Sequence, residues 1–302
     1  MNFGERLTDA IGRVGNPACV GIDPHLDLLP DDFAVARDPA RPRAERAAAL
    51  RDFCLGLVEV AAGRVSTIKP QSAFFERLGA DGVAAWESVV GQARDAGLIV
   101  LGDVKRGDIG STATAYCQAT LVQGDGNGDA PRLHAATLNP YLGTDSMQPF
   151  LDACKDSSGI FVLVRTSNPG SADFQTLGEP ELWESVARTV ARWGEECASS
   201  PDGLTPVGAV VGATHPELLA RARALMPRTP LLLPGYGAQG AGARDVVDAF
   251  LDGQPGQGAL ITASRSVCFA YRNEKHAGLH WKDAAAAALD EMTSDLSAAL
   301  AC

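Results

Sequence analysis

The sequence predicts a single (β/α)₈ (TIM) barrel, on three observations. Short apolar runs alternate with helix-like stretches along the chain, which is typical of an α/β fold. About eight strand-then-helix units can be counted, the number that a (β/α)₈ barrel contains. The length of 302 residues suits such a barrel, and no linker or low-complexity segment divides the chain. We therefore expect one domain spanning residues 1–302, although a doubly wound parallel sheet would give a similar alternation.

The predicted strands are apolar runs with the length and branching of buried strands. In chain order they are Ala18–Ile22, Ser66–Lys69, Leu98–Asp103, Arg132–Leu138, Gly159–Val164, Val207–Val211, Pro230–Leu233 and Ala259–Thr262. The helix-like stretches lie between or after them. These are Arg43–Ala62, Asp81–Ala96, Ser111–Val122, Thr144–Ala153, Glu179–Cys197, His215–Leu225, Ala241–Leu251 and Lys282–Leu300.

Composition narrows the class of protein. The net charge of −11 argues against nonspecific binding to nucleic acid. No apolar run approaches the length of a membrane span, and the start, MNFGERLTDA, lacks the apolar core of a signal peptide. The seven cysteines form no CxxC pair, which is typical of reduced thiols in a cytoplasmic protein. They are Cys19, Cys54, Cys117, Cys154, Cys197, Cys268 and Cys302.

The segment from residue 98 to 112 carries the densest chemistry. The apolar run Leu98–Leu101 is followed by Gly102, then by Asp103, Lys105 and Asp108. Alternate residues of a strand share a face, so Asp103 and Lys105 should point the same way, whereas Asp108 needs a bend or serves another site. Buried acids and bases must pair, and their titrations are coupled. The segment is a candidate site for moving charge or protons, the alternative being a solvated turn with surface ion pairs.

Two loops late in the chain suggest a phosphate site. Residues Gly235–Gly240 read GYGAQG and match the G-x-G-x-x-G pattern, but they follow the seventh predicted strand instead of the first strand of a dinucleotide-binding unit. The loops after strands seven and eight of a barrel commonly hold phosphate. Gln239 can donate a hydrogen bond, and Arg265, after Ser264, can make a charged contact. NADP binding and a plain turn are the alternatives.

Charged residues also end the first two predicted strands. Asp23 follows Ala18–Ile22, and Lys69 ends the second strand. Together with Asp103, Lys105 and Arg265 they would make one rim of the barrel highly charged. Active sites of barrel enzymes lie at this carboxyl end of the strands.

Other polar patterns point to no site. His25 lies near Asp23, but a structural role is favoured, and the five histidines show no metal-ligand spacing. Asp125–Asp129 imitates a calcium loop, yet Ala130 and Ala136 stand where such a loop needs glycine and glutamate. We expect a flexible polar loop there and no metal site.

These residues together resemble the orotidine 5′-phosphate decarboxylase family, and its longer bacterial form in particular. The matching motifs run in order from the first strand to the last, so the resemblance covers essentially the whole chain. They are Gly21-Ile22-Asp23-Pro24, Lys69-Pro70-Gln71, Asp103-Val104-Lys105-Arg106-Gly107-Asp108-Ile109, Thr166-Ser167-Asn168-Pro169-Gly170, Pro234-Gly235-Tyr236-Gly237-Ala238-Gln239-Gly240 and Ser264-Arg265.

The resemblance implies roles for the charged rim. Lys105 resembles the family's proton donor to C6 of the pyrimidine, and Asp103 the carboxylate beside the departing carboxylate. Lys69 resembles the lysine that orients this group. Asp23 and Lys69 also resemble the pair that holds the ribose hydroxyls.

The resemblance further implies a homodimer. Asp108, Ile109 and Thr112 match positions that the family lends across the dimer interface to the neighbouring subunit's site. This would explain the odd spacing of Asp108, which we count among the catalytic residues.

The remaining implied contacts bind the rest of the substrate. Ser167 resembles the residue that reads the amide edge of the pyrimidine, and Gln239 and Arg265 resemble the phosphate grip. Ser264, beside Arg265, is counted among the substrate-binding residues. The implied activity is cofactor-free, metal-free decarboxylation of orotidine 5′-monophosphate to uridine 5′-monophosphate. The alternatives are a magnesium-dependent phosphosugar decarboxylase or aldolase on the same barrel, and a non-catalytic module that binds phosphate or nucleotide.

Overall fold

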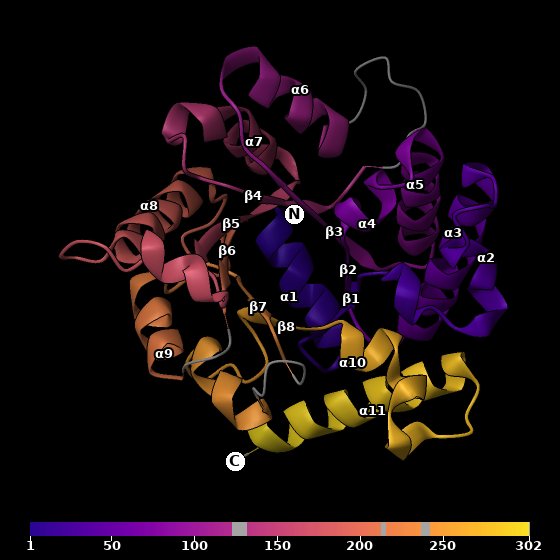
Figure 1. Cartoon of the computed structure of the whole chain (residues 1–302). Helices are drawn as coiled ribbons and strands as arrows, with labels where there is room; N and C mark the ends of the chain where they lie inside the picture. The colour runs from indigo at the N-terminus through magenta and orange to yellow at the C-terminus, as the bar shows by residue number, and fades with distance from the viewer. Residues whose placement is uncertain (123–131, 213–215, 237–241, 302) are drawn as a thin grey trace.

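Eight parallel strands form a closed barrel, which confirms the predicted fold class and excludes a doubly wound sheet. In the computed structural model each strand pairs with the next, and β8 pairs with β1 to close the ring. The structure describes residues 1–122, 132–212, 216–236 and 242–301. Figure 1 shows the strands at the centre with helices around them. The strands are β1 Ala18–Ile22, β2 Thr67–Pro70, β3 Ile99–Arg106, β4 Ala135–Leu138, β5 Gly159–Arg165, β6 Val207–Val211, β7 Leu231–Pro234 and β8 Ala259–Ala263.

The outer helices follow the predicted stretches closely. One predicted helix, residues 241–251, is instead the 3₁₀ helix η4, Ala243–Ala249, within the described part of that stretch. The helices are α2 Ala34–Arg37, α3 Arg43–Ala61, α4 Ser72–Glu76, α5 Gly79–Asp95, α6 Gly110–Thr120, α7 Thr144–Asp156, α8 Leu182–Cys197, α9 Pro216–Leu225, α10 Arg265–Cys268 and α11 Trp281–Leu300.

A helix that we did not predict, α1 (Phe3–Val14), covers the N-terminal end of the barrel. Asn2 and Glu5 form a reciprocal capping box at its start, with both hydrogen bonds at 2.9 Å. Phe3, Leu7 and Ile11 are buried against side chains inside the barrel, and Phe3 packs edge-to-face on Phe161. In Figure 1 α1 crosses the centre of the strand ring. This helix therefore closes one end of the barrel with apolar side chains.

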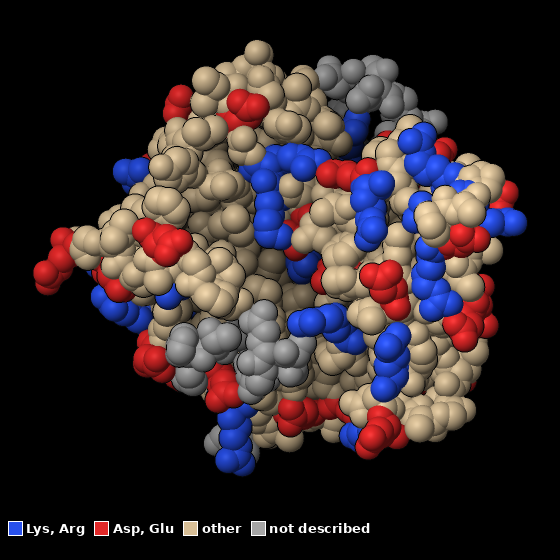
Figure 2. Space-filling view, in the orientation of Figure 1, with Lys and Arg blue, Asp and Glu red and all other residues tan. Residues whose placement is uncertain are grey.

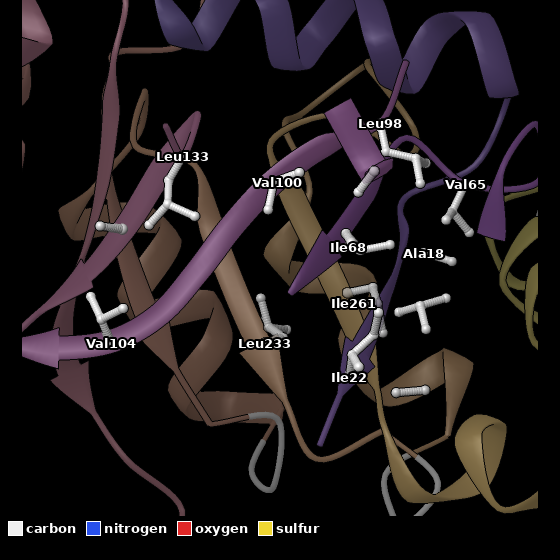
Figure 3. Close-up of a cluster of buried hydrophobic side chains, with 14 of the residues drawn as sticks. Ala18, Ile22, Val65, Ile68, Leu98, Val100, Val104, Leu133, Leu233 and Ile261 are labelled. Atoms are coloured by element: carbon white, nitrogen blue, oxygen red, sulfur yellow. The ribbon is translucent and has the colours of Figure 1, made fainter. Parts of the chain in front are cut away.

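The strands are apolar on both faces because each face is covered. Ile68 and Val100 belong to the larger cluster, which packs the strands against the surrounding helices. Figure 3 shows part of this cluster, with residues from β1, β2, β3, β7 and β8 side by side. The alternate residues Ile99 and Leu101 belong to the smaller cluster inside the barrel. This alternation decides which later residues of each strand face the interior.

Two further predictions concern the whole chain. Among the residues that the structure describes, no helix is long and apolar enough to cross a membrane. Six cysteines are free and buried, and the seventh, Cys302, lies outside the described residues. Burial raises the pKa of these thiols, for example to about 12 for Cys19 and about 11 for Cys117, so neither thiol is activated.

Candidate active site

The alternation of β3 carries its charged residues to the interior of the barrel. Ile99 and Leu101 face inward, and the next two residues of the same parity are Asp103 and Lys105. The ammonium Nζ of Lys105 lies 2.5 Å from Oδ1 of Asp103. The prediction that these two side chains share a face is confirmed.

Asp103 is the centre of a saturated cluster. Its Oδ1 accepts hydrogen bonds from Lys105 Nζ at 2.5 Å and from Thr137 Oγ1 at 2.9 Å. Its Oδ2 accepts from Lys69 Nζ at 2.7 Å and from Gln71 Nε2 at 3.0 Å. Each carboxylate oxygen thus receives one ammonium and one neutral donor, which fills the usual capacity of the group. Four donors from three strand ends fix the carboxylate in one orientation.

The charges in this cluster reinforce one another. Burial would raise the pKa of Asp103, but the ammonium groups of Lys69 and Lys105 outweigh it and lower the pKa to about 2. Burial would lower the pKa of Lys69, but the carboxylates of Asp103 and Asp23 raise it above its ordinary value. Asp103 therefore remains a carboxylate, and Lys69 an ammonium, at neutral pH.

Lys105 is the charged member of the cluster that a ligand can reach. Its side chain is 45% exposed, whereas those of Lys69 and Asp103 are 7% and 8% exposed. Figure 2 shows a hollow at the centre of this face, with basic and acidic side chains along its wall. A cation held by buried partners but open to a hollow can stabilise negative charge on a bound molecule and can donate a proton.

The backbone of Lys105 is strained. Its φ is +44°, and it is the one non-glycine residue with positive φ in the described part of the chain. Such a conformation costs on the order of 1–3 kcal/mol and persists where the surroundings impose it, often at functional sites. The strain coincides with a shift in the pairing of β3 with β4, between Gly102 and Arg106. The chain departs from regular strand geometry at the residue that presents the cation.

Beyond the cluster, the ends of β1 and β8 present polar atoms without partners. Within the described structure, Oδ1 of Asp23 and Oγ of Ser264 are buried and make no hydrogen bond. Buried polar atoms are normally bonded, so these two suit a polar ligand. Arg265 follows Ser264 and is exposed. The predicted residues Asp23, Lys69, Ser264 and Arg265 all lie at or beyond the carboxyl ends of strands.

The loop after β5 forms a small cavity beside the rim. Ser167 lines a cavity of about 210 Å³ together with Thr166 and Gly212. The guanidinium of Arg165 donates to Ser171 Oγ at 2.5 Å, which ties the start of the loop to its middle. Ser167 therefore lies on a braced loop that a ligand can approach.

The structure describes only the start of the predicted phosphate loop after β7, Gly235 and Tyr236. Gly235 has a φ of +109°, a conformation that favours glycine. The hydroxyl of Tyr236 donates to Asp295 on α11, which anchors the loop where it leaves β7. Gln239 lies outside the described residues.

Three predicted residues do not join the cluster within this chain. Asp108 lies between β3 and α6, and its Oδ1 accepts the N–H of Ile109 at 2.8 Å. Ile109 is 58% exposed, and Thr112 is also exposed. No described side chain of the Lys69–Asp103–Lys105 cluster bonds to any of the three. His25 packs its ring edge-on against Phe74 and Phe269, contacts that suit the expected structural role.

Sequence reasoning missed two members of the cluster, Gln71 and Thr137. Gln71 follows Lys69 by two positions, so the alternation that paired Asp103 with Lys105 would have placed it on the same face. Thr137 lies between two apolar residues of a buried strand, Ala136 and Leu138. A hydroxyl in such a strand needs a hydrogen-bond partner, and that need was the available signal.

Comparisons with known proteins show the family to which this chain belongs. The sequence profile of the orotidine 5′-phosphate decarboxylase / HUMPS family matches residues 17–279. The orotidine 5′-phosphate decarboxylase of Rhodopirellula baltica is 42% identical over 303 residues, covering 98% of this chain and 99% of the relative. That of Deinococcus radiodurans is 44% identical over 295 residues, covering 97% and 98%. The structure of Leishmania donovani OMP decarboxylase superposes with a TM-score of 0.75 at 33% identity, covering 100% of both chains. The chain therefore belongs to the orotidine 5′-phosphate decarboxylase / HUMPS family.

Proposed function

We propose that this protein decarboxylates orotidine 5′-monophosphate to uridine 5′-monophosphate and CO₂, the last step of de novo UMP synthesis. Family membership and full-length similarity to enzymes of that name support this activity. The observation that carries the proposal is the Lys69–Asp103–Lys105 cluster at the carboxyl end of the barrel. A carboxy-lyase of this kind needs a fixed cation where carbon–carbon cleavage leaves an electron pair.

Lys105 supplies that cation in the proposed mechanism. Loss of CO₂ from C6 of the pyrimidine leaves negative charge with no ordinary electron sink. The ammonium of Lys105, held 2.5 Å from Asp103, stabilises this charge and then donates a proton to C6. The salt bridge to Asp103 fixes the position of the ammonium, so the proton donor is in place when the carbanion forms.

Asp103 contributes chiefly by positioning. Its carboxylate would also repel the carboxylate of the substrate. At contact distance in a polar site, that repulsion is worth about 1–4 kcal/mol, whereas enzymes lower barriers by roughly 8–23 kcal/mol. Stabilisation of the carbanion must therefore supply most of the rate enhancement, with Asp103 holding the ammonium groups of Lys69 and Lys105 in place.

The remaining rim residues bind the rest of the nucleotide in this proposal. Asp23 and Lys69 hold the ribose hydroxyls, and the unpaired buried Oδ1 of Asp23 supports that assignment. Ser167 reads the amide edge of the pyrimidine from its cavity. The phosphate is held by Arg265, with Ser264 beside it, and by Gln239. Binding energy from the phosphate helps to close the site around the ring.

The active form is proposed to be a homodimer in which Asp108 completes the partner's site. Asp108, Ile109 and Thr112 do not bond to the cluster of their own chain. Ile109, Tyr141 and Leu142 are exposed apolar residues, with Tyr141 78% exposed. Tyr141 and Leu142 follow the end of β4, where the backbone N–H of Asn139 donates to the carbonyl of Arg106 at the end of β3. Exposed apolar residues grouped beside a site are typical of an interface.

Mixed dimers test the shared site. Lys105→Ala and Asp108→Ala chains are each expected to be inactive alone, because every site lacks one residue. Co-refolded, each mixed dimer should contain one intact site and regain roughly half of wild-type turnover per dimer. Absence of recovery in dimers shown to be mixed by mass spectrometry would overturn the sharing of Asp108.

The activity itself is tested by adding orotidine 5′-monophosphate to metal-stripped protein and following its absorbance. We expect the absorbance to fall at the same rate with and without chelator, because the cation in the mechanism is an ammonium. Turnover that requires added magnesium would favour the phosphosugar decarboxylase or aldolase alternative. Binding of the nucleotide without release of CO₂ would favour the non-catalytic module.

The proposed compartment is the cytoplasm. The buried free cysteines of the described chain support this proposal, because thiols remain reduced in that compartment. Fractionation of cells with antibody detection would test it.

A further inference from the structure

We propose that Thr137 is a positioning residue whose hydroxyl locks the backbone of Lys105 to the carboxylate of Asp103. Its Oγ1 accepts the backbone N–H of Lys105 at 3.0 Å and donates to Asp103 Oδ1 at 2.9 Å. This inference rests on the proposed function, because the hydroxyl is proposed to orient Lys105, the proton donor of that reaction. Thr137 itself is 1% exposed and acts through its two neighbours.

The pairing of β3 with β4 explains why a side chain is needed there. Gly102 pairs with Ala136, but the next described pair is Arg106 with Leu138. β3 therefore carries two extra residues opposite Thr137. The regular ladder does not bind the N–H of Lys105 within this irregularity, and the hydroxyl of Thr137 binds it instead. Bulges of this kind re-aim side chains and are enriched beside active sites.

The chemistry of the three groups fixes the direction of both hydrogen bonds. A backbone N–H can only donate, and the Asp103 carboxylate, with its pKa lowered to about 2, can only accept. The hydroxyl of Thr137 has one proton, so it gives that proton to Asp103 and accepts from Lys105. Only one orientation of the hydroxyl hydrogen satisfies both hydrogen bonds. The β-branched side chain is also restricted at χ1.

The Lys105 side chain needs such a constraint more than its partners do. Lys69 and Asp103 are surrounded by protein, whereas the side chain of Lys105 is 45% exposed. A long exposed side chain is free to rotate unless its base and its tip are both held. The Asp103 carboxylate holds the tip, and the Thr137 hydroxyl holds the strained base at φ +44°. The same hydroxyl joins the two restraints, so its loss should loosen both.

The kinetic test compares three variants. Thr137→Val keeps the shape but removes the hydroxyl, and Thr137→Ser keeps the hydroxyl. Because Thr137 is not proposed to touch the substrate, Thr137→Val should lower kcat about 10- to 100-fold while KM changes less than about 2-fold. Thr137→Ser should restore kcat to within about 3-fold of wild type. Thr205→Val, a buried threonine at the opposite end of the barrel, should leave both constants unchanged.

A second measurement separates this inference from the proposed function. Residue-resolved hydrogen exchange by NMR should show the Lys105 amide protected in the wild type and in Thr137→Ser, and exposed in Thr137→Val. This readout needs no turnover, so it stands even if the protein fails to decarboxylate orotidine 5′-monophosphate. If Thr137→Val does not fold, Thr137→Ala serves in its place. An unprotected Lys105 amide in the wild type, or a Thr137→Val enzyme with wild-type kcat, would overturn the proposal.

Discussion

The interior of the barrel is filled by apolar side chains at one end and by charged side chains at the other. At the N-terminal end, α1 inserts Phe3, Leu7 and Ile11 among apolar side chains, and all three are buried. At the C-terminal end, the same inward positions of β3 become Asp103 and Lys105, with buried charge and a strained backbone. One end gives stability by burial of apolar surface, and the other uses some of that stability to hold a cation in place.

Substitutions at the two ends should therefore affect different properties of the protein. A change at the N-terminal end should alter the free energy of unfolding and leave the chemistry intact. A change at the charged end should alter turnover far more than it alters the free energy of unfolding. Conserving stability at one end of a barrel while varying chemistry at the other is the general behaviour of this fold.

The largest expected effect is at the charged end. Lys105→Ala should lower kcat at least about 10³-fold, since it removes both the cation and the proton donor. Its free energy of unfolding should fall by only about 1–3 kcal/mol, because the buried carboxylate of Asp103 loses one of its two ammonium partners but keeps its other three donors. Absorbance assays and urea titrations measure the two quantities. The control is Lys155→Ala, an exposed lysine paired with Asp152, which should change neither.

The opposite pattern is expected from Phe3→Ala. Removing this fully buried ring should lower the free energy of unfolding by about 3–5 kcal/mol, while kcat per folded molecule is unchanged. Urea unfolding and active-site titration check the two parts. Phe174→Ala, at an exposed phenylalanine, should cost less than about 0.5 kcal/mol. A fall in kcat for folded Phe3→Ala would contradict the division between the two ends.

A smaller effect should appear with pH near the N-terminal end of β4. Burial, with Arg94 and Arg6 nearby, lowers the pKa of His134 to about 4. Between about pH 6.5 and pH 4 the unfolded chain binds a proton that the folded chain does not. The free energy of unfolding should therefore fall, by roughly 3 kcal/mol at most, as the pH drops through this window.

Substitution identifies the histidine responsible. His134→Gln should lose this component of the pH dependence, whereas His280→Gln, at an exposed histidine, should retain it. Urea titrations at a series of pH values measure the difference. An unchanged slope in His134→Gln would mean that another group causes the effect.

The smallest expected effect concerns the cap of α1. Asn2→Ala removes the side-chain acceptor for the N–H of Glu5 and should lower the free energy of unfolding by about 1 kcal/mol. Turnover should not change. Urea titrations and steady-state kinetics measure the two quantities. A fall in kcat without a fall in the free energy of unfolding would show that α1 contributes to catalysis.

The sequence predicted the fold well because the barrel is built from a repeated signal. The apolar runs at β1 and β6 match their strands in full, and the remaining ends differ by a few residues. α1 was missed although Phe3, Leu7 and Ile11 have helical spacing, because this helix precedes the first strand and belongs to no strand-then-helix unit. β3 extends beyond the prediction, to Arg106, because pairing continues after the apolar run has ended.

The candidate site was only partly predictable. Period-two alternation was enough to bring Asp103 and Lys105 together, and a charged strand end was enough to find Lys69. The role of Thr137 was not readable, because it depends on a shift in the pairing of β3 with β4 that the pattern of residues does not reveal. The positive φ of Lys105 was also hidden, since lysine carries no preference for that conformation.

The most direct test of the central claim is a crystal structure with uridine 5′-monophosphate bound. We expect Nζ of Lys105 to lie within about 3.5 Å of C6 of the pyrimidine while it remains bonded to Asp103. An ammonium turned out to solvent, or a pyrimidine bound away from the Lys69–Asp103–Lys105 cluster, would contradict it.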